Sequence, residues 1–214
     1  MSRRGVVFDL DGTLADTLPD IAGAVDAGLT ALGLPGCSVA QVQAWVGEGL
    51  PTLCARALGS RTDAPLDRLV QLVTEHYTAH RLDRTRPYPG VVELLASLSG
   101  AGIPMAVLTN KPQIHTGPIV DALFGAGLFM EVRGYQREER RKPDPRDLLE
   151  IAAVMGLPPA AVLMVGDSPT DIRTARNAGA RPVGVTWGYR MRDELVAAGA
   201  AHLIDRPDEL LTLL

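Results

Sequence analysis

The hydrophobic residues of this chain gather in short, unbroken runs, and several of these runs end in acidic or other polar residues. The clearest runs lie within residues 5–10, 105–108 and 162–165, and a weaker one covers 182–186. A continuous apolar run, as opposed to an alternating one, is typical of a strand that is covered on both faces in a parallel sheet. We therefore predict four parallel strands, with a short edge strand near residues 202–204.

Segments with the periodicity of helices lie between these runs. Strands that alternate with helices predict an α/β fold built on a parallel sheet. Gly179 follows the last helix of this set and is suited to end it, because glycine adopts the left-handed conformation of a C-cap. The predicted helices cover residues 91–98, 114–124, 147–155 and 171–178.

One long segment, residues 15–88, breaks this alternation because it contains no convincing strand. Its pattern predicts four helices, separated by Gly and Pro, at residues 21–32, 39–46, 50–58 and 66–82. The predicted fold is therefore α/β, a Rossmann-like parallel sheet core with an inserted α-helical domain. We expect residues 1–14 and 89–214 to form the core and 15–88 to form the insert.

The composition favours a globular protein with a sizeable core. The chain is 46% hydrophobic but only 4% aromatic, so aliphatic side chains must fill the interior. A net charge of -4 without a basic block argues against nucleic acid and anionic membranes as partners. No apolar run reaches the roughly 18 residues that a membrane-spanning helix needs. We expect a cytoplasmic protein, a monomer or homodimer, with Cys37 and Cys54 as reduced thiols.

Polar side chains follow the predicted strands. In an open parallel sheet, ligands bind beyond the carboxyl ends of the strands, so these side chains should meet at one edge. Asp9 and Asp11 follow the first strand, and Asp167 follows the third, with Asp171 four residues later. The second strand ends in Thr109 and Asn110, and Lys142 precedes the third.

The types of these residues indicate a particular chemistry. Several carboxylates with no nearby His or Cys favour Mg²⁺ as the bound cation. A metal and a lysine around a carboxylate form an anion site suited to phosphate, and an aspartate can accept a phosphoryl group covalently. A second carboxyl two residues further on could protonate the leaving alkoxide. Only two of the 21 cationic residues are lysines; we expect Lys142 to take part in the chemistry and Lys111 to be solvated.

In their order and spacing, these motifs resemble the haloacid dehalogenase superfamily. The matching segments are 9–13, 109–110, 142–143 and 166–168 with Asp171, and the insert lies where this superfamily places a helical cap. The resemblance implies that Asp9 is the nucleophile and Asp11 the general acid/base. It implies phosphoryl binding by Thr109, Asn110 and Lys142. It also implies Mg²⁺ binding by Asp9, the carbonyl of Asp11 and Asp167, with Asp171 either next to these ligands or bound to the metal through water.

Within that superfamily, the sequence favours a phosphatase. A halide leaves without a proton whereas an alkoxide needs one, so a carboxylic acid at position 11 argues for ester cleavage. Segments 46–49, 56–58, 109–112 and 185–189 resemble the phosphoglycolate phosphatase group, so we expect 2-phosphoglycolate as the substrate. A pyrophosphatase, a sugar-phosphate phosphatase or a phosphomutase remains an alternative. A non-catalytic phosphate-binding or receiver-like module is a different class, against which the insert and the retained acids argue.

Three residues of the insert are candidates for binding the carboxylate of such a substrate. Gly47 and Gly49 would let the backbone approach a small ligand, and Arg56 follows them as a cation. The alternatives stay open that the glycines cap a helix and that Arg56 is a solvated helix residue. The Arg- and Glu-rich segment 135–141 departs from the pattern of the group, and the sequence assigns it no role.

Overall fold

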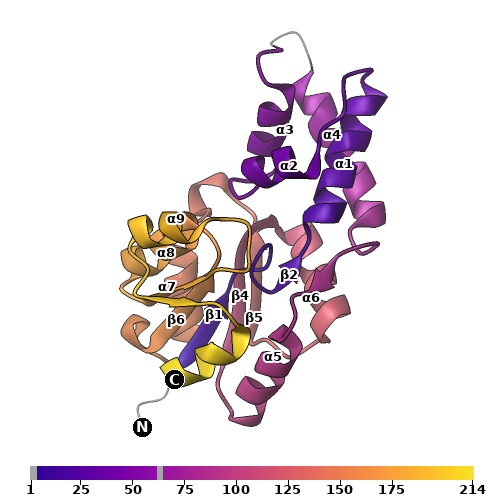
Figure 1. The fold of residues 1–214 in the computed structure, drawn as a ribbon. Helices are drawn as coiled ribbons and strands as arrows, with labels where there is room; N and C mark the ends of the chain where they lie inside the picture. Colours follow the sequence, from indigo (N-terminus) through magenta and orange to yellow (C-terminus); the bar gives the residue numbers. More distant parts are fainter. Residues whose placement is uncertain (1–3, 62–64) are drawn as a thin grey trace. The chain divides into compact units, whose positions relative to one another are not determined.

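The computed structural model describes residues 4–61 and 65–214 and divides into two compact units (Figure 1). One unit consists of Met1–Ala15 and Pro87–Leu214, and the other is Asp16–Arg86. From the sequence we expected boundaries after residues 14 and 88. The two chain connections between the units are the short strands β2 (Ala15–Asp16) and β3 (Arg86–Pro87), which pair with each other.

A parallel sheet forms the centre of the first unit, as predicted. In the described part of the chain this sheet has six strands, in the order β5-β4-β1-β6-β7-β8. The predicted α/β fold is confirmed. The strands are β1 (Gly5–Phe8), β4 (Met105–Pro112), β5 (Glu131–Tyr135), β6 (Val162–Gly166), β7 (Arg181–Val185) and β8 (His202–Ile204).

Helices cover this sheet, and one large core cluster lies under two of them. Val7 of β1 and Met164 of β6 pack there against Leu148, Ile151 and Ala175. Each fully buried aliphatic side chain of this kind contributes about 1.5–3 kcal/mol relative to exposure. The helices are α5 (Val91–Gly100), α6 (Gln113–Phe124), α7 (Arg146–Val154), α8 (Pro169–Ala178) and α9 (Arg192–Ala198). Short 3₁₀ helices cover Glu138–Arg140, Pro159–Ala161 and Pro207–Leu213.

One strand of the six-stranded sheet and one α-helix of this unit were not predicted. Strand β5 carries Glu131 and Arg133 on a half-buried edge, where the two side chains form an ion pair, so it has no continuous apolar run. Helix α9 is only seven residues long and buries only two side chains, Leu195 and Ala198. Both elements have too weak a hydrophobic period to be found from sequence.

Strand β1 lies between the two strands that carry the other polar rim residues. Phe8 is in register with Val107 of β4 on one side and with Val165 of β6 on the other. The backbone N–H of Asp9 then donates to the carbonyl of Val165 at 2.9 Å. This register brings the carboxyl ends of β1, β4 and β6 to the same edge of the sheet, where ligands bind in folds of this kind.

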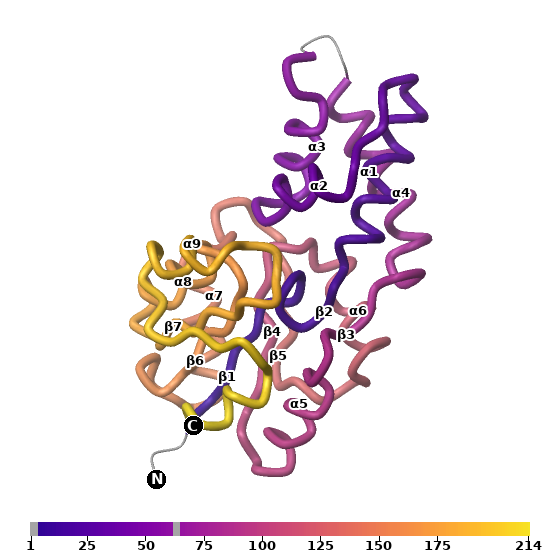
Figure 2. The backbone as a smooth tube through the Cα atoms, viewed as in Figure 1, coloured from indigo at the N-terminus to yellow at the C-terminus, as the bar shows by residue number. Residues whose placement is uncertain are grey.

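The second unit is helical, as the pattern of the insert predicts. Helix α1 packs along α4, and the two can be followed side by side in the backbone trace (Figure 2). Gly28 permits this close approach, because a Cβ atom there would lie 2.9 Å from a methyl group of Val73. The helices are α1 (Leu18–Ala31), α2 (Val39–Trp45), α3 (Leu50–Leu58) and α4 (Leu66–His80).

In residues 4–61 and 65–214, we find no helix with the length and apolar character needed to span a bilayer.

Candidate active site

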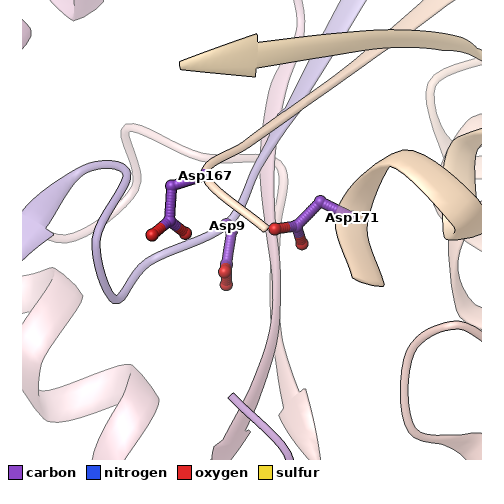
Figure 3. A group of neighbouring side chains, drawn as sticks. All are labelled: Asp9, Asp167 and Asp171. Atoms are coloured by element: carbon purple, nitrogen blue, oxygen red, sulfur yellow. The ribbon is translucent and has the colours of Figure 1, made fainter. Parts of the chain in front are cut away.

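Three aspartates from separate elements meet at the edge of the sheet. Asp9 follows β1, Asp167 follows β6, and Asp171 lies in the first turn of α8. One carboxylate oxygen of each lies within 4.8 Å of the others (Figure 3). Their exposed fractions are 7%, 2% and 0%, so bulk water does little to screen the repulsion between them.

The start of helix α8 orients Asp171. Ser168 is the N-cap residue, and its backbone N–H and hydroxyl both donate to Oδ2 of Asp171, at 3.1 and 2.6 Å. Gly166 passes so close that a Cβ atom there would collide with the Asp171 carboxyl. The capping box therefore directs the second oxygen, Oδ1, toward the site.

Lys142 lies between two members of the cluster. Its Nζ is 2.9 Å from Oδ1 of Asp9 and 2.6 Å from Oδ1 of Asp171, and the residue is 6% exposed. Burial alone would lower the pKa of Lys142, but the carboxylates of Asp171 and Asp9 outweigh it and raise that pKa above its ordinary value. Lys142 is therefore a fixed positive charge beside Asp9.

A single ammonium does not balance the cluster. Burial, together with the charges of Asp171 and Asp11 and against the opposing effect of Lys142, raises the pKa of Asp9 from 3.8 to about 6. Burial and the neighbouring Asp171 and Asp9 also raise the pKa of Asp167 well above its ordinary value. Carboxyls whose charged form is disfavoured in this way stand to gain from an additional cation.

The backbone packs closely around Asp167. The N–H of Tyr189 donates to its Oδ2 at 2.7 Å, and the Thr13 hydroxyl lies 3.5 Å from its Oδ1. Gly12 adopts a φ of 81°, and a Cβ atom there or at Gly188 would collide with Asp167. These residues belong to the matching segments 9–13 and 185–189, but the sequence did not predict that they surround Asp167, because glycine gives no chemical signal and the contact of Tyr189 is made by its backbone.

The residues at the end of β4 serve partly to position others. The side-chain amide of Asn110 donates to the carbonyl of Lys142 at 3.1 Å and accepts from its N–H at 2.8 Å. Asn110 thus fixes the loop that presents the Lys142 ammonium. Thr109 is 3% exposed, and its hydroxyl oxygen accepts from the N–H of Lys111 at 3.2 Å. A direct role of either side chain toward a phosphoryl group stays a prediction.

Lys111 differs from expectation. The sequence suggested a solvated side chain, but the residue is only 6% exposed, and its Nζ lies 2.9 and 3.1 Å from the two carboxylate oxygens of Asp11. The expectation was wrong because the turn after β1 brings Asp11 to the end of β4. The scarcity of lysine in this chain was a usable signal, since it applies to Lys111 as much as to Lys142.

The candidate residues of the insert lie around one loop of the second unit. Gly47 and Gly49 both have positive φ, 122° and 88°, in the connection between α2 and α3. Arg56 donates to the carbonyl of Trp45 at 2.9 Å and forms an ion pair with Glu48 at 2.7 Å. In this structure Arg56 holds that loop together, and its contact with a substrate stays a prediction.

Part of the Arg- and Glu-rich segment joins an ion-pair network. Arg140 of this segment and Arg133 of β5 each pair with Asp147 and Glu150 of α7. The network ties the chain just before Lys142 to the helix that follows it. Exposed ion pairs are individually weak, but a shared network restrains a loop more than an isolated pair does.

Comparisons with known proteins agree with this geometry. The model of the haloacid dehalogenase-like hydrolase family matches residues 4–179. A protein of Mesorhizobium japonicum named phosphoglycolate phosphatase is 39% identical over 90% of this chain and 86% of its own length. One of the same name from Pseudomonas syringae pv. tomato is 36% identical over 94% of this chain and 75% of its own.

Solved structures give the same picture. A crystal structure of a predicted phosphoglycolate phosphatase from Haemophilus somnus is 31% identical, with a TM-score of 0.92, over 100% of this chain and 98% of that one. The structure of CbbY from Rhodobacter sphaeroides in complex with phosphate has a TM-score of 0.80 at 25% identity, over 97% of this chain and 96% of that one. From the family match and these relatives, the chain belongs to the haloacid dehalogenase-like hydrolases.

Proposed function

We propose that this protein hydrolyses small phosphate monoesters, with 2-phosphoglycolate as its main substrate, through a phosphoryl-aspartate on Asp9. The observation that carries the proposal is the position of Asp9. This buried carboxylate lies at the carboxyl edge of the sheet, in contact with the Lys142 ammonium and beside two further carboxylates. The names of the relatives supply the expected substrate.

The donor set fits Mg²⁺. Asp9, Asp167 and Asp171 offer oxygen atoms only, and hard oxygen ligands suit this ion. The raised pKa values of Asp9 and Asp167 agree with this, because a divalent cation would stabilise the charged forms that burial and the neighbouring carboxylates disfavour. Asp9, Asp167 and the Asp11 carbonyl would hold the metal, with Asp171 next to them. When bound, Mg²⁺ would neutralise negative charge on the phosphoryl oxygens.

In the first step, a carboxylate oxygen of Asp9 forms a bond to phosphorus as the ester P–O bond breaks. Asp11 gives its carboxyl proton to the leaving oxygen, which departs as the alcohol. Lys142 stabilises the negative charge on the nucleophile and on the transferred group. The hydroxyl of Thr109 and the fixed loop around Asn110 complete the polar wall at the end of β4.

In the second step, water attacks the phosphorus of the phosphoryl-aspartate. Asp11, now a carboxylate, accepts a proton from that water, and the bond between phosphorus and Asp9 breaks to release phosphate. Asp11 thereby returns to its starting protonation state. Its place two residues after Asp9, on the same turn, suits this alternating role.

The proposal is tested by assaying the pure protein, with and without Mg²⁺, on a panel of phosphorylated metabolites that includes pyrophosphate and hexose phosphates. We expect 2-phosphoglycolate to have the highest kcat/KM and a chelator to abolish turnover. An acid-quenched sample should carry one phosphoryl group on the peptide that contains Asp9.

The matched control is Asp9→Asn, which keeps the shape of the side chain but removes the nucleophile. We expect its turnover to fall by at least about 10⁴-fold. Wild-type turnover by a folded Asp9→Asn protein would rule out the mechanism. A clear preference for pyrophosphate or a hexose phosphate would keep the mechanism and replace the substrate.

A further inference from the structure

Lys111 is a second buried cation at the site, and the mechanism above does not use it. Its side chain is 4% exposed, and the ammonium lies 2.9 and 3.1 Å from the two oxygens of Asp11, whose side chain is 15% exposed. Asp11 is the residue assigned to the leaving group, whereas Lys142 contacts the nucleophile. The two lysines of this chain thus contact different reacting groups: Lys142 contacts Asp9, and Lys111 contacts Asp11.

The contact between Lys111 and Asp11 has to change when a substrate binds. To protonate the leaving oxygen, Asp11 must turn one carboxyl oxygen toward it and give up part of its contact with the ammonium. A buried ammonium is costly to leave without a compensating anion. A substrate that brings its own negative charge to this position would keep Lys111 compensated.

We propose that Lys111 binds a carboxylate carried by the leaving alcohol and so selects short phosphorylated hydroxy acids. In the complex, the substrate carboxylate takes the place of one Asp11 oxygen on the Lys111 ammonium, and Asp11 is released toward the ester oxygen. The inference rests on the proposed phosphatase function and identifies the group that recognises the carboxylate of the substrate.

The geometry sets a limit on the length of that acid. The ester oxygen lies one hydrogen bond from Asp11, and Lys111 lies one hydrogen bond from Asp11 on its other side. Because the two oxygens of one carboxyl are about 2.2 Å apart, the ester oxygen and the ammonium are at most roughly 8 Å apart. The carboxylate of glycolate, which is bonded directly to the ester carbon, can accept from an ammonium within this range, so a short hydroxy acid fits the gap.

The other candidate cation is differently placed. Arg56 already pairs with Glu48 and donates to the carbonyl of Trp45, and its side chain is 34% exposed. A half-solvated, paired guanidinium gains less from a substrate carboxylate than a buried ammonium beside the reacting groups. We therefore assign the reading of the carboxylate to Lys111, and the comparison of the two variants tests this assignment.

The experiment compares 2-phosphoglycolate with its neutral amide, 2-phosphoglycolamide, which has nearly the same size but no carboxylate charge. With Mg²⁺ present, we expect the wild type to prefer the acid in kcat/KM by about tenfold to a hundredfold. Lys111→Met should lose this factor on the acid, while its kcat/KM on the amide changes much less. 4-Nitrophenyl phosphate serves as a general phosphatase substrate throughout.

Two control variants isolate the effect. Arg192→Met removes an exposed cation that pairs with Asp205, and it should leave both kcat/KM values unchanged. Arg56→Met should keep the preference for the acid. Thermal unfolding of each variant shows whether it is folded, and Lys111→Gln replaces Lys111→Met if the latter is not.

Three results would overturn the inference. The first is a wild type that does not prefer the acid, which needs no variant to be folded. The second is an equal loss on acid and amide in the Lys111 variants, because this is what a residue that only positions Asp11 would cause. The third is loss of the preference in Arg56→Met. If the wild type hydrolyses none of the three compounds, the proposed function itself fails, and this inference fails with it.

Discussion

Buried carboxylates occur in both units of this protein, but their surroundings shift their pKa values in opposite directions. Asp20 of helix α1 is 3% exposed and accepts hydrogen bonds from the backbone N–H groups of Arg84 and Thr85 and from the Thr85 hydroxyl. Burial on its own would raise the pKa of Asp20, but these hydrogen bonds outweigh it and lower the pKa below 3.8. At the edge of the sheet, the pKa values of Asp9 and Asp167 are raised.

The difference lies in how the surroundings satisfy each charge. Asp20 has donors for both oxygens, so its negative charge stabilises the fold by holding the start of α1 to the chain just before β3. Asp9 and Asp167 lie beside another carboxylate, and their charges are compensated only in part. A buried acid whose oxygens accept enough hydrogen bonds typically has a structural role. A group of buried acids whose charges are not fully balanced is typical of a site that binds a cation or transfers charge.

The largest change should come from the cation that partly balances the cluster. In Lys142→Arg the charge is kept, but a wide guanidinium cannot replace a compact ammonium between Asp9 and Asp171. We expect turnover of 2-phosphoglycolate to fall by about 10²–10³-fold, the effect of removing a positioned charge from a transition state. The measurement is kcat at saturating Mg²⁺, with Arg192→Lys as the control for a Lys–Arg exchange elsewhere. Near-normal activity would mean that Lys142 only balances charge.

The second prediction tests the structural acid. Asp20→Asn removes the charge and places an NH₂ group against the donors of Arg84 and Thr85. We expect a loss of about 2–3 kcal/mol in the free energy of unfolding, because buried donors lose a charged acceptor. Urea unfolding at neutral pH measures this loss. Asp26→Asn, in the same helix, is a milder control because its single described hydrogen bond, from the N–H of Cys37, is exposed.

An unchanged stability of Asp20→Asn would show that the Asp20 charge contributes nothing to the fold and would remove the contrast between the two regions. The direction in which this contribution changes with pH follows from the pKa shift of Asp20. Since the pKa of Asp20 is lowered by folding, its contribution is present above about pH 4 and is lost as the pH falls further.

The smallest effect concerns pH and metal together. Because folding raises the pKa of Asp9 from 3.8 to about 6, the folded metal-free protein holds more protons than the unfolded chain between those values. The contribution of Asp9 to stability therefore decreases as the pH rises through this window, and the raised pKa of Asp167 acts with the same sign. A bound cation should reverse the loss.

We expect Mg²⁺ to raise the melting temperature more at pH 8 than at pH 5, with a stabilisation on the order of 1–2 kcal/mol at millimolar concentrations. Melting curves with Mg²⁺ and with a chelator, at both pH values, measure the difference. Asp167→Asn should reduce the Mg²⁺ effect, whereas Asp20→Asn should leave it intact. A Mg²⁺ effect that is equal at the two pH values would contradict the prediction.

Much of the fold could be predicted because its signal is local. The apolar runs around Val7, Val107 and Leu163 identify their strands without knowledge of their neighbours, and the four helices of the insert have clear periods. Strand β5 could not be found in this way, because Arg133 is half-buried through pairs with Asp147 and Glu150, which lie on another element.

For the site, sequence could indicate which residues carry chemistry but not which residues hold them. Asp9, Asp167 and Lys142 belong to motifs whose residue types indicate a function. The clamp of Asn110 on the backbone of Lys142, and the pairing of Lys111 with Asp11, depend on contacts between residues 32 and 100 positions apart. Such contacts leave no local pattern, so Lys111 was assigned to solvent until the fold placed it.

The central position of β1 has a consequence for synthesis of the protein. This strand is made first, yet its neighbours β4 and β6 follow about 100 and about 150 residues later. At about 5–20 residues per second, roughly 8 to 30 s pass between the synthesis of β1, which precedes Asp9, and that of β6. During that time the apolar strand β1 has no neighbouring strand to pair with. A chaperone that binds the nascent chain would therefore contact β1 before the sheet forms.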